Sequence, residues 1–186
     1  MTPTGTANTS MEGNNIRTSA VSVRRMVLCS LFAALIAICA WLSIPIGDIA
    51  FTMQTFAVFL TLGILGGSWG TVSILLYLLL GAVGLPVFSG FQGGPGTLLG
   101  VTGGYIWGFL ASGLVYWGLE RFSKPAAMIA GMLMCYICGT FWFHMYAGGG
   151  LMLAAARCVL PYLIPDALKI AMALDLSRRI GKHLKY

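Results

Sequence analysis

Charge is scarce in this chain of 186 residues. Asp, Glu, Lys and Arg make up only 9% of the sequence, whereas an average soluble domain is about one quarter charged. At the same time, 58% of the residues are hydrophobic. So few charges exclude an ordinary soluble domain of this size, and the composition indicates an integral membrane protein.

Motifs for nucleotide, metal and redox chemistry are also missing. No glycine-rich segment completes GxxxxGK[ST] or GxGxxG. His144 has no ligand-forming residue at helical spacing, so we expect no metal site. Cys135 and Cys138 have redox-motif spacing but lie in an apolar run, where thiols act as small apolar filler. Without a Ser or Cys near a His, we predict that the protein is not an enzyme and holds no cofactor.

Apolar runs separated by Gly, Pro and charge predict the membrane crossings. A spanning helix needs about 20 apolar residues, which leaves room for six or seven spans. Residues 1–23 have no apolar run, so we predict a flexible N-terminal tail followed by a six-helix membrane domain over 24–186. The predicted spans are 26–46, 54–65, 71–84, 103–119, 125–146 and 159–176.

The basic residues decide between five spans and six, because the second and third runs are short enough to be one broken span. With six spans and the N-terminus inside, all of the eleven basic residues except Arg157 and Lys169 fall in cytoplasmic regions. Merging the two short runs would place Arg121 and Lys124 outside, against the positive-inside tendency. We therefore predict an all-α fold with both termini cytoplasmic. The net charge of +6 then reflects topology and the lipid bilayer rather than nucleic acid.

The segment 81–104, between the third and fourth predicted spans, contains nine glycines and no charge. Its glycines alternate with apolar residues, so this outer loop can fold back over apolar surface. Glycine permits positive φ angles and close backbone approach, which exposes backbone groups to a small neutral polar ligand. We predict a lid over a substrate pocket, and the alternative is a tight re-entrant connection.

Asp166 and Lys169 are unusual because they lie inside the last predicted span. A charge at membrane depth costs about 2.5–3.5 kcal/mol on insertion scales. The two residues are i, i+3 neighbours on one helix face, where they either neutralise each other or bind a substrate. Arg157, at the mouth of the same span, either reaches lipid headgroups or contacts an anion.

Two further groups of residues each allow two readings. The aromatic residues Phe91 and Tyr105 lie on the outer side, as members of an interfacial belt or of a pocket. Ala33 and Ala37 are small residues four apart in the first span. Such spacing lets helices approach closely, either within the fold or against a partner.

Four motifs carry a resemblance to a known family: FTMQT at 51–55, YLLLGAVGLPVFSG at 77–90, TGGY at 102–105 and PDALK at 165–169. They resemble the BioY family, the biotin-specific S-components of energy-coupling factor (ECF) transporters. The resemblance covers the chain from the first span to the last. It implies a six-helix subunit of the bacterial cell membrane that captures biotin from outside. Energy would come from a transmembrane coupling subunit and paired ATPases.

The resemblance also implies roles for individual residues. Asp166 would accept hydrogen bonds from the ureido group of biotin, and backbone groups near Gly93 and Gly94 would complete the polar contacts. Phe91 and Tyr105 would pack on the biotin rings.

Further roles follow for the remaining candidates. Lys169 or Arg157 would orient Asp166 or pair with the biotin carboxylate, and the residues leave both assignments open. Gln54 is a further candidate for the pocket, and Ala33 and Ala37 resemble the small-residue motif that meets the coupling subunit. The alternatives are an S-component for another vitamin, or a solo proton-coupled carrier with Asp166 as its relay.

Overall fold

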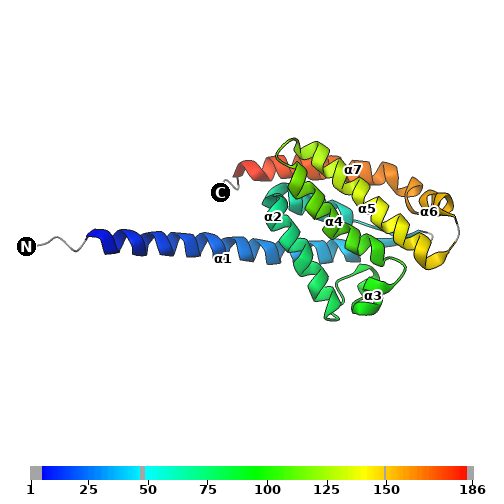
Figure 1. The fold of residues 1–186 in the computed structure, drawn as a ribbon, viewed down its shortest axis with the longest axis horizontal. Helices are drawn as coiled ribbons and strands as arrows, with labels where there is room; N and C mark the ends of the chain where they lie inside the picture. Colours follow the sequence, from blue (N-terminus) through cyan, green and yellow to red (C-terminus); the bar gives the residue numbers. More distant parts are fainter. Residues whose placement is uncertain (1–5, 47–48, 149, 184–186) are drawn as a thin grey trace, which may run out of the picture.

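The computed structural model describes the backbone of residues 6–46, 49–148 and 150–183, and the side chains of 23–44, 50–148 and 150–182. Helices dominate these ranges, together with one small hairpin of strands (Figure 1). In chain order the elements are α1 (Thr6–Trp41), β1 (Ser43–Ile46), β2 (Ile49–Thr52), α2 (Gln54–Ala82), η1 (Ser89–Phe91), α3 (Pro95–Leu99), α4 (Gly103–Leu119), α5 (Lys124–Ala147), α6 (Leu151–Cys158) and α7 (Leu160–His183).

Several helices have the length and composition of membrane spans. Residues Val23–Trp41 of α1, all of α2 and all of α5 qualify singly, and α6 with α7 qualifies as a pair bent by 46°. Helix α4 has 17 residues, the lower limit for a span. The prediction of a helical membrane protein is therefore confirmed.

Helix α2 reverses direction at Gly66, which has φ 78° and ψ 172°. A straight helix would separate Gln54 and Tyr77 by about 34 Å, yet the Gln54 amide donates a hydrogen bond to the Tyr77 hydroxyl at 3.0 Å. The two halves therefore lie side by side. Beyond the break, the Gly67 N–H donates to Oε2 of Glu120 at 2.9 Å. The break separates the two short runs predicted at 54–65 and 71–84.

The hairpin corrects the predicted first span, 26–46. Helix α1 ends at Trp41, and β1 pairs with β2 in antiparallel register, with Ser43 opposite Thr52. Proline and β-branched residues in SIPI disfavour continuation of the helix and favour extended backbone. At its other end α1 begins at Thr6, within the predicted tail. The flexibility predicted for residues 1–23 stays a prediction.

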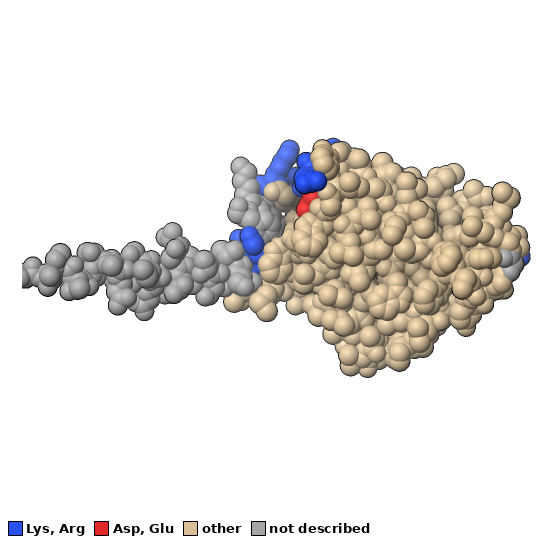
Figure 2. Space-filling view, viewed as in Figure 1, with Lys and Arg blue, Asp and Glu red and all other residues tan. Residues whose placement is uncertain are grey.

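Different elements form the two ends of the molecule. The start of α1 and the end of α7 lie on the left in Figure 1, whereas α3 and α6 lie on the right. Lys and Arg gather at the left end of the tan body, and most of the visible surface to the right of them carries no charge (Figure 2). Inside the fold, the Ser112 hydroxyl of α4 donates to the carbonyl of Gly131 in α5 at 2.6 Å, which joins these two helices by a polar contact.

Candidate functional site

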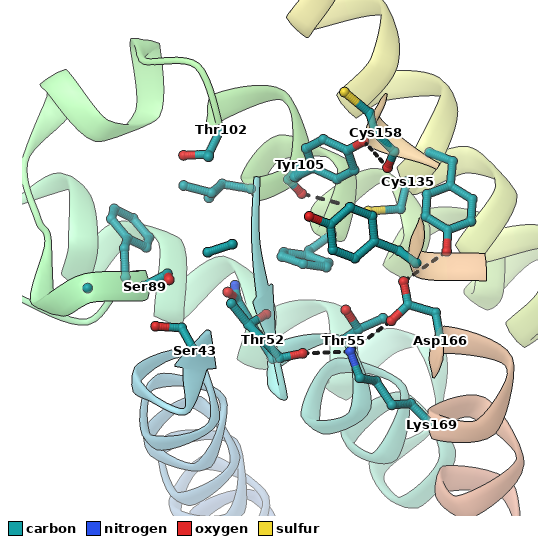
Figure 3. Close-up of a pocket in the computed structure, with 18 of the residues that line it drawn as sticks. Ser43, Thr52, Thr55, Ser89, Thr102, Tyr105, Cys135, Cys158, Asp166 and Lys169 are labelled. Carbon is teal, nitrogen blue, oxygen red and sulfur yellow. Dashed lines mark hydrogen bonds and ion pairs between the residues drawn. The ribbon is translucent and has the colours of Figure 1, made fainter. Parts of the chain in front are cut away.

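A cavity of about 460 Å³ lies among the hairpin, the loop 83–102 and the helices α2, α4, α5, α6 and α7 (Figure 3). This volume is typical of pockets for small organic ligands. The hairpin and the loop contribute mainly hydroxyl and amide groups, and the helices contribute aromatic side chains together with the charged pair Asp166 and Lys169. The lining residues on which the site depends are Thr52, Gln54, Phe88, Gln92, Tyr105, Tyr136, Cys158, Tyr162, Asp166 and Lys169.

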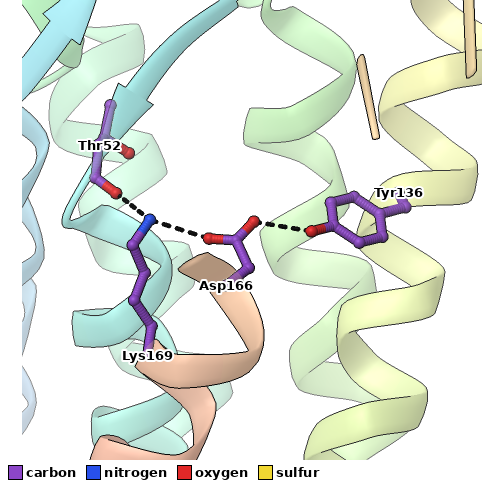
Figure 4. Close-up of polar contacts among 4 residues, drawn as sticks. All are labelled: Thr52, Tyr136, Asp166 and Lys169. Carbon is purple, nitrogen blue, oxygen red and sulfur yellow. Dashed lines mark hydrogen bonds and ion pairs between the residues drawn. The ribbon is translucent and has the colours of Figure 1, made fainter. Parts of the chain in front are cut away.

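Asp166 and Lys169 form the charged part of this lining. The Lys169 ammonium donates to Oδ1 of Asp166 at 2.8 Å and to the Thr52 carbonyl at 2.6 Å. The Tyr136 hydroxyl donates to Oδ2 of Asp166 at 2.8 Å (Figure 4). Asp166 and Lys169 are 5% and 3% exposed, so the charges are compensated by each other rather than by water.

The geometry of this cluster leaves capacity for a ligand. A carboxylate offers about four lone-pair sites, and the two oxygens of Asp166 each accept one hydrogen bond from the protein. The Lys169 ammonium also lies 3.8 Å from the centroid of the Phe51 ring, a favourable cation–π contact. Lys169 therefore holds Asp166 in place while the carboxylate can still accept donors from the cavity.

A second polar group, Gln54, begins α2. Its side chain is 4% exposed and is oriented by the hydrogen bond to Tyr77. The Tyr77 ring meets the Phe88 ring edge-on, with centroids 5.5 Å apart. A Cβ at Gly81 would overlap the Phe88 ring, so glycine at that position lets the loop insert Phe88 into the cavity wall.

Tyr105 of α4 lines the cavity next to α6. Its hydroxyl donates to the Cys158 carbonyl at 3.0 Å, and its ring occupies the space that a Cβ at Gly139 would need. The phenol is therefore fixed between α5 and α6. The aromatic face of Tyr105 can pack against a ligand, but its hydroxyl is already bonded to the protein.

The glycine-rich loop is held at three points. The Trp41 indole donates to the Pro86 carbonyl at 2.8 Å, and the Trp142 indole donates to the Gly100 carbonyl at 2.9 Å. Between them, the Gly94 N–H donates to the Gly81 carbonyl at 2.7 Å. Gly94 has φ 89°, a conformation that favours glycine. Ser89, Gly90 and Gln92 of this loop line the cavity.

Of the predicted substrate-binding residues, the structure brings Asp166, Lys169, Tyr105 and Gln54 together around the cavity. Phe91 does not line it: this side chain is 64% exposed and stacks on Trp41 with centroids 5.1 Å apart. Phe91 also has φ 56°, which turns its side chain away from the neighbouring lining residues.

The other predicted site residues lie elsewhere. Gly93 packs against the Leu85 carbonyl, and Gly94 bonds to Gly81 rather than facing the cavity. Arg157 is exposed in the last turn of α6 and is not part of the lining. The roles predicted for these three residues stay predictions.

Ala33 and Ala37 are buried, with exposed fractions of 1% and 6%. Both belong to the main hydrophobic core, which favours internal packing, one of the two readings that the sequence allows. On this part of α1 the exposed positions are Ser30, Leu31, Ala34 and Ile38. The partner contact predicted for the buried pair is not tested by this arrangement.

Sequence reasoning missed Tyr136 and Thr52, the two partners that complete the Asp166 cluster. Tyr136 lies in the predicted span 125–146, where nothing in the sequence distinguishes its face from that of neighbouring aromatic residues. Within the described side chains, no group of three or more His, Cys, Asp or Glu is placed to hold a metal ion.

Comparison with known proteins places this chain in a family. Residues 11–186 match the model of the BioY family. The "Biotin transporter BioY" of Thermotoga maritima is 37% identical over 166 residues, which cover 86% of this chain and 97% of that protein. The "Biotin transporter BioY2" of Lactococcus lactis subsp. cremoris is 36% identical over 171 residues, which cover 87% and 94%.

A solved structure has the same fold. The crystal structure of an S-component for biotin from an ECF-type ABC transporter superposes with a TM-score of 0.81 at 24% identity, covering 88% of this chain and 93% of that one. Together with the match over 11–186, these similarities show that the chain belongs to the BioY family.

Proposed function

We propose that this chain captures biotin as the substrate-specific membrane subunit of an ATP-driven ECF transporter. The observation that carries the proposal is the buried Asp166–Lys169–Tyr136 cluster in the wall of a cavity of about 460 Å³. The names of the relatives support biotin as the ligand. The solved structure with the same fold is an S-component of an ECF-type ABC transporter, which supports an ECF assembly.

The chemistry of biotin suits the cavity. Its ureido group carries two N–H donors and one acceptor, next to an apolar thioether ring. Asp166 accepts the ureido donors, and Lys169 orients the carboxylate by the hydrogen bond at 2.8 Å. Tyr105 packs on the rings, and the Gln54 amide, which is part of the lining, pairs with a polar ligand atom.

The biotin carboxylate needs a different partner, because Lys169 is occupied by Asp166 and Thr52. Arg157 lies one residue from Cys158, which lines the cavity. Arg157, in the last turn of α6, is therefore the candidate for the carboxylate. Gly93 and Gly94 support this site by fixing the loop from which Ser89 and Gln92 face the ligand.

The proposed topology has six crossings with both ends in the cytoplasm of a bacterial cell. The crossings are α1, the two halves of α2, α4, α5 and the bent pair α6 and α7. The contact between Gln54 and Tyr77 supports counting α2 twice, and the basic residues at one end support the orientation (Figure 2). The glycine-rich loop then lies over the cavity on the outer side.

Energy for uptake comes from a transmembrane coupling subunit and paired ATPases. A solo carrier driven by protons through Asp166 would instead depend on the proton gradient. It would need neither the coupling subunit nor the ATPases. Uptake by cells that contain the chain alone, abolished by collapsing the proton gradient, would support the solo carrier. Uptake that requires the coupling subunit and an intact ATPase supports the ECF assembly.

Ligand identity is tested by calorimetric titration of the purified chain with biotin, using thiamine and riboflavin as controls. One-to-one binding of biotin without nucleotide, and no binding of the controls, supports capture of biotin. Binding of a control vitamin by folded protein, with no binding of biotin, would contradict the proposed ligand.

A further inference from the structure

A second, smaller cavity lies where α1 meets the break in α2. It measures about 260 Å³ and is lined by Arg25, Leu65, Ser68 and Trp69. Arg25 precedes Trp41 by 16 residues, so the cavity lies about 24 Å along α1 from the glycine-rich loop that Trp41 contacts. The cavity is therefore separate from the biotin site and lies at the opposite end of the membrane domain.

Hydrogen bonds between α1 and the second half of α2 establish where along these two segments the smaller cavity lies. The Cys29 thiol donates to the Trp69 carbonyl at 3.4 Å, and the Ser73 hydroxyl donates to the Cys29 carbonyl. At the far end the Trp41 indole contacts Pro86. The two segments therefore run parallel, and Arg25 lies beside Trp69 at the end where the second half of α2 begins.

The guanidinium cation of Arg25 lies over the aromatic ring of Trp69. It lies 5.7 Å from the centroid of the Trp69 ring, a distance at which the cation is attracted to the ring face. Arg25, Leu65, Ser68 and Trp69 are all partly exposed. The cavity thus combines one cation and one hydroxyl with an apolar wall, and it is open to a ligand.

The surrounding charge favours an anion. Seven basic residues with described side chains lie at this end: Arg24, Arg25, Arg121, Lys124, Arg178, Arg179 and Lys182. Among the described side chains, only two acidic residues lie there, Glu120 and Asp175, so basic residues outnumber acidic ones at this end. Glu120 accepts the Gly67 N–H, and Asp175 pairs with Arg179 at 2.8 Å.

The surfaces of both helices stay apolar further toward the middle of the membrane. Leu31 of α1 is 62% exposed, and Val72 and Leu75 of α2 are 46% and 41% exposed. The parallel register places these side chains on the membrane side of Arg25 and Trp69. A soluble anion would gain nothing from this surface, whereas the acyl chains of a lipid would cover it.

We propose that this cavity binds the phosphodiester headgroup of an anionic phospholipid. Arg25 pairs with the phosphate, Ser68 donates a hydrogen bond to it, and the glycerol and acyl chains pack on Leu65 and Trp69. A charge-assisted pair of this kind is stronger than the diffuse attraction of surface charges. The site is distinct from the proposed biotin site, because neither Arg25 nor Ser68 lines the larger cavity.

The test is native mass spectrometry of the full chain in detergent, titrated with phosphatidylglycerol or phosphatidylcholine. The wild-type chain retains one phosphatidylglycerol in preference to phosphatidylcholine. Arg25→Gln weakens retention about tenfold. Lys182→Gln is the matched control, since it removes an exposed charge from the same end and changes retention less than about twofold. Circular dichroism of both variants establishes that they are folded, and Arg25→Lys, which keeps the charge, retains part of the preference.

Three results would overturn the proposal. Equal weakening in Arg25→Gln and Lys182→Gln would mean diffuse attraction rather than a site. Displacement of the lipid by an equal concentration of inorganic phosphate would mean a site for free anions. Unchanged lipid retention in Arg25→Gln, with loss of binding to the coupling subunit, would assign the cavity to that protein.

Discussion

Lys169 of α7 joins two parts of the cavity wall, because its ammonium bonds to Asp166 on its own helix and to the Thr52 carbonyl at the end of β2. The lysine therefore connects the charged cluster to the hairpin. A cation that bridges a carboxylate and a backbone carbonyl in a buried site has little freedom to turn toward a ligand. This arrangement favours an orienting role for Lys169 over direct pairing with the biotin carboxylate.

Replacement of Lys169 by Met should destabilise the protein. Removing one partner of a buried ion pair leaves Asp166 uncompensated, which costs about 3–5 kcal/mol. We expect a lower thermal unfolding temperature and faster hydrogen exchange in β2. The exposed cation Lys124→Met is the control and should change neither quantity. Equal unfolding temperatures for Lys169→Met and the wild type would contradict the bridging role.

Replacement of Tyr136 by Phe removes one hydrogen bond to Asp166 without removing the aromatic ring. Hydrogen bonds to charged groups contribute about 1.5–3 kcal/mol. We expect biotin to bind at least about tenfold more weakly, measured by titration. Tyr146→Phe removes a hydroxyl from a residue that is 57% exposed and should leave the affinity unchanged. If both variants bind like the wild type, Tyr136 does not position Asp166.

Gly81→Ala should displace Phe88 from the cavity wall, since the new methyl group would overlap the Phe88 ring. Overpacking of this kind costs about 1–3 kcal/mol. Both the unfolding temperature and biotin affinity should fall. Gly118→Ala is the matched control in α4, where a Cβ meets no atom within 4 Å. A Gly81→Ala protein as stable as Gly118→Ala would show that the loop accommodates the methyl group without moving Phe88.

Ala33→Trp should disrupt the core, because Ala33 is 1% exposed. Biotin binding and stability should therefore fall together, as measured by titration and thermal unfolding. Ala34→Trp, on the exposed side of α1, should preserve both. A folded Ala33→Trp protein that binds biotin normally but supports no uptake would instead support the partner contact predicted for Ala33 and Ala37.

The sequence predicts the long helices and the charged pair well because both leave strong local signals. Apolar runs identify α4 and α5 to within a few residues, and the flexible Gly66 falls between the two short runs. Asp166 and Lys169 stand out because charge is rare in this composition. Their i, i+3 spacing already places them on one face.

Other features depend on tertiary contacts that leave weak local signals or none. Residues 43–46 continue the apolar run of α1, so the length of the run predicts a longer helix, although the proline and β-branched residues of SIPI favour extended backbone. Ala33, Ala34 and Ala37 are equivalent in sequence, and only the packing of α1 on α2 decides that Ala34 is exposed. In the loop, the positive φ of Phe91 turns outward the ring that sequence reasoning places in the pocket, and Phe88 enters instead.

The most direct test of the account is the biotin affinity of Asp166→Asn compared with Asp175→Asn. Both variants remove one negative charge from α7, but Asp166 lies buried in the cavity wall and Asp175 forms an exposed pair with Arg179. We predict that Asp166→Asn binds biotin at least about tenfold more weakly, while Asp175→Asn binds like the wild type. Wild-type affinity in a folded Asp166→Asn protein would contradict the claim that Asp166 accepts the ureido hydrogen bonds.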